Sequence, residues 1–248
     1  MRPDVVSLPL ELWRVHQTAY GPLNPPPRPG RPTQAWSRFD LRGWATLYGA
    51  ATPDGAYMEA LAYAQVADLD LASLFDDEDP EPIADQWSRL GHMALGSVPR
   101  QWRDVRALTC FGPRDGGGHV VDIASAGSLA YLRATADRWA PAGLRDDPRS
   151  IDVSLLTGPR RTATSRAAWW LSRTVLDDGS VPVGIAYPSR HGMDLRCYAL
   201  WVDLDRHGPE VAVADAVGAE YKIYDSSAIE LTDPALLRTQ KRLSLHLF

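Results

Sequence analysis

The hydrophobic positions of this 248-residue chain fall into short strand-like runs and longer helical stripes. Aromatic-rich and β-branched runs predict strands at residues 10–20, at two places around Gly43 within 36–50, within 98–112, at 119–123, 183–187 and 197–204, and as a final pair within 209–224. Helical spacing of apolar residues predicts helices from residue 53 towards 67, at 125–139, 162–176 and 234–243, with a polar linker at 140–150. The mixture has no regular βαβ rhythm, which predicts an α+β domain rather than a doubly wound sheet.

The first predicted helix carries one carboxylate in an apolar setting. Thr52 is a suitable N-cap, and Pro53 fits the first helical position. Glu59 follows within a run of Ala, Tyr, Leu and Met, and no Lys or Arg occurs between residues 43 and 88. If Glu59 is buried, it therefore needs a partner from distant sequence or a raised pKa. The alternative is a helix-surface glutamate that reaches water.

Three other stretches offer chemistry that complements a carboxylate. Arg14 lies inside one predicted strand, and Arg38 lies inside a second. Ser189, Arg190 and His191 form a turn after a later strand. Taken singly, the arginines are explained as edge-strand residues and the serine as an ordinary turn residue. Taken together, they predict a site for a phosphate-bearing substrate that develops positive charge.

Composition narrows the class of protein. The net charge is −5, and 23% of the residues are charged, so the chain is expected to fold and gives no general argument for nucleic acid or membrane as a partner. Of the 26 basic residues, only Lys222 and Lys241 are lysines. The predominance of arginine suits bidentate anion binding, but the composition of a GC-rich genome also explains it. Cys110 and Cys197 belong to no metal-binding motif, so we expect free buried thiols and no metal site.

The ends and the polar stretches of the chain bear on location and partners. The N-terminus has no signal-peptide pattern, and no apolar run approaches the length of a membrane span, so we expect a cytoplasmic protein. The proline-rich stretch 22–32 is a surface spacer or a loop that covers a site. The acidic stretch 68–85 is a solvated loop or a docking surface for a basic partner.

The ordered set of candidate residues resembles the RES domain, which is named for an Arg, a Glu and a Ser. The matching pieces are WR at 13–14, SRFD at 37–40, LY at 47–48 before the helix with Glu59, and GIAYPSR at 184–190. The resemblance covers about residues 10–205, so the whole chain, 1–248, is expected to be one RES-like domain with a C-terminal strand and helix extension at 209–248. The Trp-Ser before Arg38 departs from the glycines that are usual in the family.

This resemblance implies a fold and an activity. The implied fold is ADP-ribosyltransferase-like, with a central mixed or split β-sheet flanked by helices. The implied protein is the toxin of a bacterial RES–Xre toxin–antitoxin pair, which consumes NAD⁺ as substrate and needs no retained cofactor. Its implied partner is a cognate helix-turn-helix, Xre-like antitoxin. Neither direct nucleic-acid binding nor membrane binding is expected, and the sequence leaves open whether the protein forms a homo-oligomer.

The residues can be given roles in cleavage of the nicotinamide–ribose bond. Glu59 would stabilise the oxocarbenium charge on the ribose. Arg14 and Arg38 would bind the diphosphate, with Arg190 as a weaker candidate. Tyr48 would stack on the nicotinamide. Ser189 would place Glu59 or bind the ribose or amide.

Two other hypotheses stay open. One is a non-catalytic binding or immunity module that retains the same fold, with the acidic stretch as its working surface. The other is a hydrolase that uses Ser189 and His191. Residues this close along the chain rarely converge, and no GxSxG motif is present. The sequence does not decide whether water, phosphate or a protein side chain accepts the ADP-ribosyl group.

Overall fold

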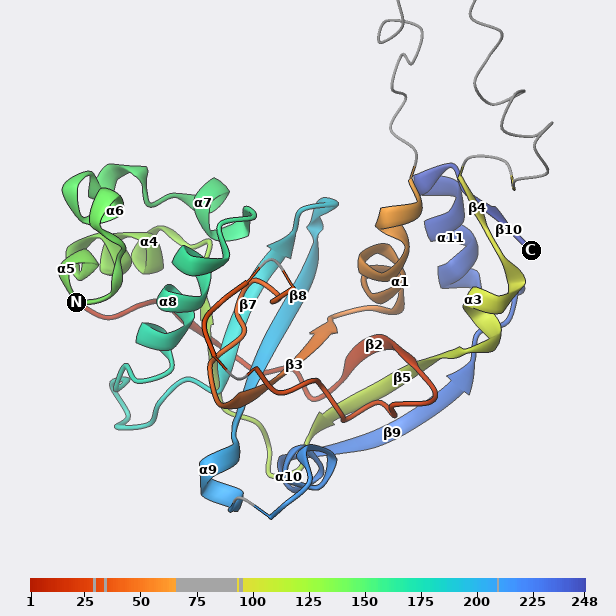
Figure 1. Ribbon diagram of the computed structural model, residues 1–248, viewed down its shortest axis with the longest axis horizontal. Helices are drawn as coiled ribbons and strands as arrows, with labels where there is room; N and C mark the ends of the chain where they lie inside the picture. The colour runs from red at the N-terminus through yellow and green to blue at the C-terminus, as the bar shows by residue number, and fades with distance from the viewer. Residues whose placement is uncertain (29, 34, 66–92, 94–95, 209) are drawn as a thin grey trace, which may run out of the picture.

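A computed structural model describes the chain apart from residues 29, 34, 66–92, 94–95 and 209 (Figure 1). The acidic stretch 68–85 and the far end of the first predicted helix thus lie outside the described residues. The strands are β1 (Val5–Ser7), β2 (Leu12–Gln17), β3 (Trp44–Ala50), β4 (Ser97–Val98), β5 (Arg106–Pro113), β6 (His119–Asp122), β7 (Gly184–Ser189), β8 (Gly192–Asp203), β9 (Tyr221–Ala228) and β10 (His246–Leu247).

The helices are mostly short. They are α1 (Pro53–Leu61), α3 (Arg100–Asp104), α4 (Ala126–Ala134), α5 (Ala136–Trp139), α6 (Ala142–Asp146), α7 (Val153–Thr157), α8 (Arg161–Leu171), α9 (Leu204–His207), α10 (Val213–Glu220) and α11 (Pro234–Leu243), with 3₁₀ turns η1 (Ala62–Ala64) and η3 (Pro148–Ser150). In the described part of the chain, no helix has the length and apolar character needed to cross a membrane.

Eight strands form one mixed sheet in the order β1-β6-β7-β8-β3-β2-β5-β9, in which β6 and β7 are parallel and the other pairs antiparallel. The sheet splits in the middle, because β2 and β3 pair only through Trp13 and Ala50. The α+β fold class and the mixed, split sheet predicted from the sequence are confirmed.

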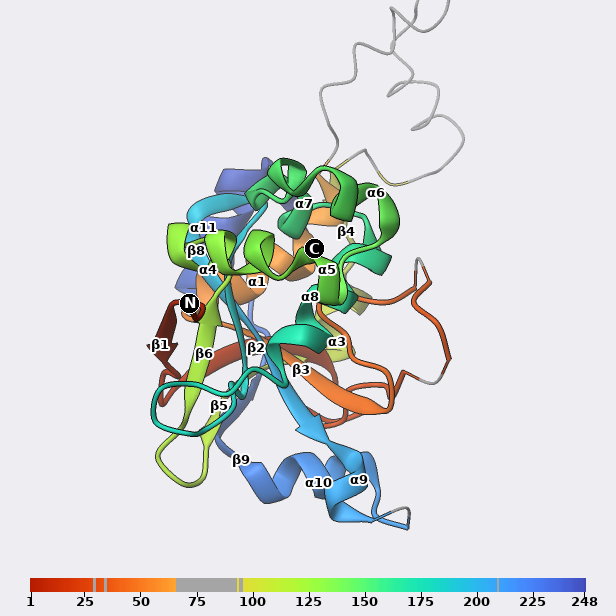
Figure 2. The same ribbon diagram turned by 90° about the vertical axis from the view of Figure 1, so that its left-hand side faces the viewer.

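The two faces of the sheet bury separate apolar clusters. Strand β8 is buried from Cys197 to Val202, and its alternate residues enter opposite clusters. Cys197 and Trp201 face a large cluster that also contains residues of α1, α4, α8 and α11. The other cluster contains residues of α10. The helices α4 to α8 form one group, and the pair α1 and α11 forms another. Both groups therefore cover the same face of the sheet, on either side of the split (Figures 1 and 2).

The described C-terminal residues, 210–248, contribute side chains to both apolar clusters. Strand β9 pairs with β5 at the edge of the sheet, and α11 packs against α1. Asp233 is the N-cap of α11 and accepts hydrogen bonds from the backbone N–H of Ala235, 2.8 Å away, and Leu236. Its other carboxylate oxygen accepts a 2.7 Å hydrogen bond from the hydroxyl of Tyr57, which is completely buried in α1. One side chain thus connects the C-terminal helix to the helix that carries Glu59.

We expect Asp233→Ala to destabilise the protein by about 2–4 kcal/mol, because it removes a helix cap and leaves the buried Tyr57 hydroxyl without an acceptor. Chemical denaturation of the variant would measure this loss. Asp225→Ala, on the exposed part of β9, should change the free energy of unfolding by less than about 0.5 kcal/mol. Equal losses in the two variants would contradict the assigned role of Asp233.

The prediction of a strand at residues 36–43 is wrong. This segment is a series of turns, and only β3 at 44–50 is a strand. The backbone N–H of Ser37 donates to Asp40, and that of Phe39 donates to the hydroxyl of Tyr48. These backbone N–H groups thus donate to side-chain oxygens instead of to the backbone of a neighbouring strand. Arg38 therefore lies in a turn rather than in a strand.

Other predicted elements also need correction. In place of the strand pair predicted within 209–224, the structure has helix α10 followed by strand β9. The Ala- and Val-rich run forms a helix that buries Ala216 and Val217 on one face. The linker 140–150 contains α6 and η3. The helix at 125–139 divides into α4 and α5, and the helix at 162–176 ends at Leu171. The helix at 234–243 is confirmed as α11.

Candidate active site

Glu59 projects from α1 and is anchored by Ser189. The N-cap Thr52 accepts a hydrogen bond from Gly55, as predicted, and the helix buries Tyr57, Met58 and Leu61 while leaving Glu59 exposed. The buried Ser189 hydroxyl donates a 2.6 Å hydrogen bond to Oε1 of Glu59. Glu59 therefore reaches water, yet its partner comes from a strand end that lies 130 residues away along the chain.

Ser189 holds the carboxylate in one orientation. Its Oγ also accepts a 3.1 Å hydrogen bond from the backbone N–H of His191, which directs the hydroxyl hydrogen towards Glu59. The His191 ring faces elsewhere, since its Nε2 accepts from Nε of Arg190 at 3.0 Å. This geometry does not form the serine–histidine pair that a hydrolase would need. Ser189 instead donates its hydroxyl hydrogen to Glu59, and its role in placing Glu59 stays a prediction.

A small pocket of about 180 Å³ opens on one side of Glu59, where β2 and β3 separate. Arg14, Tyr48 and Cys197 contribute to its walls. The side chains of Tyr48 in β3 and Cys197 in β8 reach it because these strands turn both residues towards the face that α1 covers. The Sγ atom of Cys197 lies 3.8 Å from Oε1 of Glu59.

Arg14 is the most unusual residue of this small pocket. Its Nε and Nη1 atoms are shielded from solvent and have no hydrogen-bond partner among the described residues. Burial lowers the pKa of Arg14 from its ordinary value to about 10. A shielded guanidinium without a carboxylate is unfavourable for folding, and such features concentrate at functional sites.

A larger pocket of about 400 Å³ opens on the other side of Glu59. Like Glu59, Tyr48 and Tyr187 line both this pocket and the small one. Arg38 contributes to its wall, and its Nη1 donates a 2.7 Å hydrogen bond to the backbone oxygen of Thr157. The Arg38 guanidinium lies 5.2 Å from the centre of the Tyr187 ring. A backbone carbonyl and an aromatic face thus hold Arg38 without neutralising its charge.

Asp40 fixes Tyr48 between the two pockets. The Tyr48 hydroxyl donates a 2.9 Å hydrogen bond to Asp40 Oδ1, while Nε of Arg28 contacts Oδ2 at 2.6 Å. Burial, followed by the Asp40 charge, raises the pKa of Tyr48, so it stays protonated. The proline-rich stretch 22–32 thus contributes Arg28 to the support of the site. The contact with Asp40 therefore fixes the position of the Tyr48 ring.

Burial also keeps the neighbouring side chains neutral. It raises the pKa of Tyr187 and of the Cys197 thiol, and the Glu59 charge acts in the same direction on both. Burial lowers the pKa of His191, and the positive charge of the nearby Arg190 acts in the same direction. Neither Cys110 nor Cys197 forms a disulfide, as predicted. Among the described residues, no group of three His, Cys, Asp or Glu side chains could hold a metal ion.

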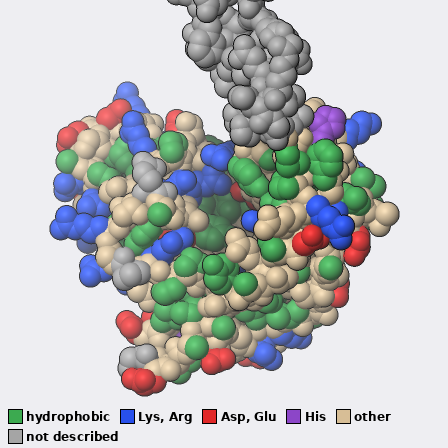
Figure 3. Space-filling model, turned by 45° about the vertical axis from the view of Figure 1, so that its right-hand side comes forward, with side chains coloured by type: hydrophobic (Ala, Val, Ile, Leu, Met, Phe, Trp, Pro, Cys, Tyr) green, Lys and Arg blue, Asp and Glu red, His purple; other side chains and the backbone are tan. Residues whose placement is uncertain are grey.

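The structure brings the six predicted site residues together around these two adjoining pockets: Arg14, Arg38, Tyr48, Glu59, Ser189 and Arg190. Their catalytic or binding roles remain predictions. Figure 3 shows the molecule hollowed here, with Lys and Arg side chains along one side of the hollow.

Sequence reasoning missed several residues of the site. Tyr187 precedes Ser189 by two positions in β7, so strand periodicity could have placed both on one face. The role of Asp40 could have been inferred from its position two residues after Arg38 in a turn. Arg161 and Cys197 carry no local signal, because only the packing of α8 and β8 brings them to the cleft.

The comparisons with known proteins identify the family. The RES domain family model matches residues 11–222, and the chain therefore belongs to the RES domain family. The match extends beyond residue 205 and includes α10.

The chain is also similar to a chain in the crystal structure of the M. tuberculosis MbcT–MbcA toxin–antitoxin complex. The identity is 11%, the match covers 97% of this chain and 92% of that one, and the TM-score is 0.42. Among curated proteins, none matches this sequence.

Proposed function

We propose that this protein cleaves NAD⁺ at the nicotinamide–ribose bond and is the toxin of a toxin–antitoxin pair. The observation that carries the proposal is the position of Glu59, which Ser189 orients at the junction between a small pocket and a basic pocket. In that position a carboxylate can stabilise an oxocarbenium ion as the bond breaks. The bond's electron pair leaves with nicotinamide, which becomes neutral, so no general acid is needed.

The two pockets suggest an orientation for the substrate. The small pocket, about 180 Å³, is below the ~300–1,000 Å³ of a typical ligand site and suits only the nicotinamide end. Tyr48 offers it a stacking face. The sequence predicts that Arg14 and Arg38 share the diphosphate, but the two residues line different pockets. We therefore propose that Arg38 and Arg190 bind the diphosphate and that Arg14 donates to the nicotinamide carboxamide.

The central test is turnover by the purified protein. Incubation with NAD⁺ should release nicotinamide, which chromatography with mass detection would quantify, and the second product would identify the acceptor as water, phosphate or a protein side chain. Expression without an antitoxin should arrest growth, and co-expression of a helix-turn-helix partner of the Xre type should restore it. Harmless expression without loss of NAD⁺ would instead favour a non-catalytic binding or immunity module.

Removal of the Ser189 hydroxyl tests the positioning of Glu59. We expect Ser189→Ala to lower kcat about 10–100-fold with little change in KM, because a hydrogen bond to a charged group contributes roughly 1.5–3 kcal/mol. Ser180→Ala is a matched control, since it removes a 2.7 Å hydroxyl–carboxylate hydrogen bond to Asp178 in an exposed turn. Steady-state kinetics of the two variants would decide, and full activity in Ser189→Ala would refute the positioning role.

A further inference from the structure

The cleft continues beyond the two pockets that Glu59 joins. A third, outer pocket of about 780 Å³ lies between the loop at residues 32–33, the segment from α6 to η3, and the start of α8. Pro159 and Arg161 line both the outer pocket and the 400 Å³ middle pocket. The small, middle and outer pockets therefore form a series in which neighbouring pockets share wall residues.

Arg161 lies where the middle and outer pockets meet. Its Nη1 donates a 3.2 Å hydrogen bond to the backbone oxygen of Gly158, and its Nε is shielded from solvent without a partner among the described residues. Burial lowers the pKa of Arg161, and the nearby charges of Arg38 and Arg190 lower it further. Guanidinium groups therefore gather here despite their mutual repulsion.

The middle pocket has an excess of positive charge. Arg38, Arg161 and Arg190 line it, and Glu59 is the acidic side chain in its wall. Another carboxylate of the site, Asp40, is already engaged by Arg28. A ligand with two adjacent negative charges, such as a diphosphate, would relieve the repulsion among the arginines.

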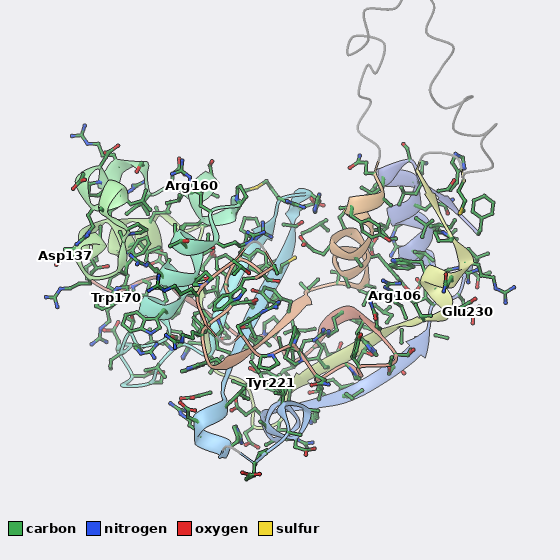
Figure 4. The ribbon with its side chains drawn as sticks, viewed as in Figure 1. Arg106, Asp137, Arg160, Trp170, Tyr221 and Glu230 are labelled. Carbon is green, nitrogen blue, oxygen red and sulfur yellow. The ribbon has the colours of Figure 1, made fainter. Side chains whose placement is uncertain are left out.

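The outer pocket has the character of a nucleoside site. Its volume is within the ~300–1,000 Å³ typical of small-molecule sites. Pro141, Leu144 and Ala163 supply apolar walls, while Asp147 and Thr162 supply polar groups. Apolar walls suit the faces of a purine base, and a carboxylate can accept hydrogen bonds from ribose hydroxyls. Arg160, at the start of α8, is on this side of the cleft (Figure 4).

We propose that the outer pocket binds the adenosine half of the dinucleotide and that Arg161 binds the diphosphate at its entrance. This inference rests on the proposed function, and it adds a second recognition site remote from the scissile bond. The protein would then prefer a dinucleotide to nicotinamide mononucleotide, although both contain the same scissile bond. Binding energy from the adenosine end would position the ribose against Glu59.

Gly143 allows the outer pocket to be blocked selectively. It lines this pocket, a Cβ added to it meets nothing within 4 Å, and its backbone is not in the left-handed region. Gly143→Trp is therefore expected to fold and to fill the pocket. Gly218 in α10 is a matched control, because a Cβ there also meets nothing within 4 Å and it does not line the cleft.

The first experiment measures ADP binding by calorimetry and does not depend on turnover. We expect Gly143→Trp and Arg161→Gln each to weaken ADP binding by at least about tenfold, and Gly218→Trp to bind like the wild type. Absence of ADP binding by the wild type would overturn the inference. Wild-type affinity in both Gly143→Trp and Arg161→Gln would overturn it as well. Should Gly143→Trp fail to fold, Arg161→Gln alone decides.

The second experiment compares cleavage of NAD⁺ and nicotinamide mononucleotide. Gly143→Trp should raise KM for NAD⁺ at least about tenfold and leave KM for the mononucleotide unchanged. Equal losses on both substrates would overturn the adenosine assignment. ADP binding that is sensitive to Gly143→Trp, without NAD⁺ cleavage by the wild type, would support the adenosine site and overturn the proposed function.

Discussion

Glu59→Gln is expected to lower kcat for NAD⁺ cleavage by about 10³-fold. Glutamine keeps the size of the side chain and can still accept the hydrogen bond from Ser189, but it removes the negative charge that faces the developing oxocarbenium ion. Because the change is at an exposed position, stability should be retained. Nicotinamide release at saturating NAD⁺ would measure the loss.

Glu230→Gln provides the comparison for this variant. Glu230 is exposed and lies at the far end of the molecule from the helices α4–α8 (Figure 4). Its replacement makes the same change in net charge, so kcat and KM should match the wild type. If Glu59→Gln retained activity within about tenfold of the wild type, the loss would be too small for a group that stabilises the transition state, and the assignment would fail.

Arg14→Met is expected to abolish NAD⁺ cleavage and at the same time to make the protein more stable. The Nε and Nη1 atoms of Arg14 are shielded and have no hydrogen-bond partner among the described residues, so replacement by an apolar side chain of similar length should raise the free energy of unfolding by about 1–3 kcal/mol. For a chain of this size, this corresponds to a rise in Tm of about 2–4 °C per kcal/mol. Calorimetry and nicotinamide release would measure the two effects.

The opposite result is expected for Arg28→Met, which leaves the buried Asp40 without its arginine partner and should lower Tm. A loss of stability in Arg14→Met would show that Arg14 is a structural residue. The two results together separate an arginine kept for binding from one that supports the fold.

The stability difference between Arg14→Met and the wild type should also depend on pH. Burial in the folded state lowers the pKa of Arg14 to about 10, so at neutral pH the folded chain carries the full penalty of the buried charge. Above pH 10 the folded wild type binds fewer protons than the unfolded chain, and its stability rises relative to the variant. The difference in free energy of unfolding should therefore shrink as the pH rises above 10.

The site shows why the local sequence could predict candidate site residues but not the contacts between them. Glu59 was recognisable because an acid without cationic helical neighbours is out of place in an apolar helix. Its partner Ser189 was recognisable only as one of several candidates, and the hydrogen bond between them depends on how β7 and α1 pack. Arg161 was not recognisable, because an arginine at the start of an amphipathic helix is ordinary in sequence.

By itself, the sequence determined the class of fold, the start of α1 at Thr52, the limits of α11 and the candidate residues on which the family resemblance depends. These features follow from periodicity, capping and composition, which act over a few neighbouring residues. Only the tertiary structure decided that β2 and β3 separate after one residue pair, that Asp40 makes residues 36–43 a turn, and that three pockets lie in series. Each of these depends on contacts between residues far apart in the chain, which no local pattern specifies.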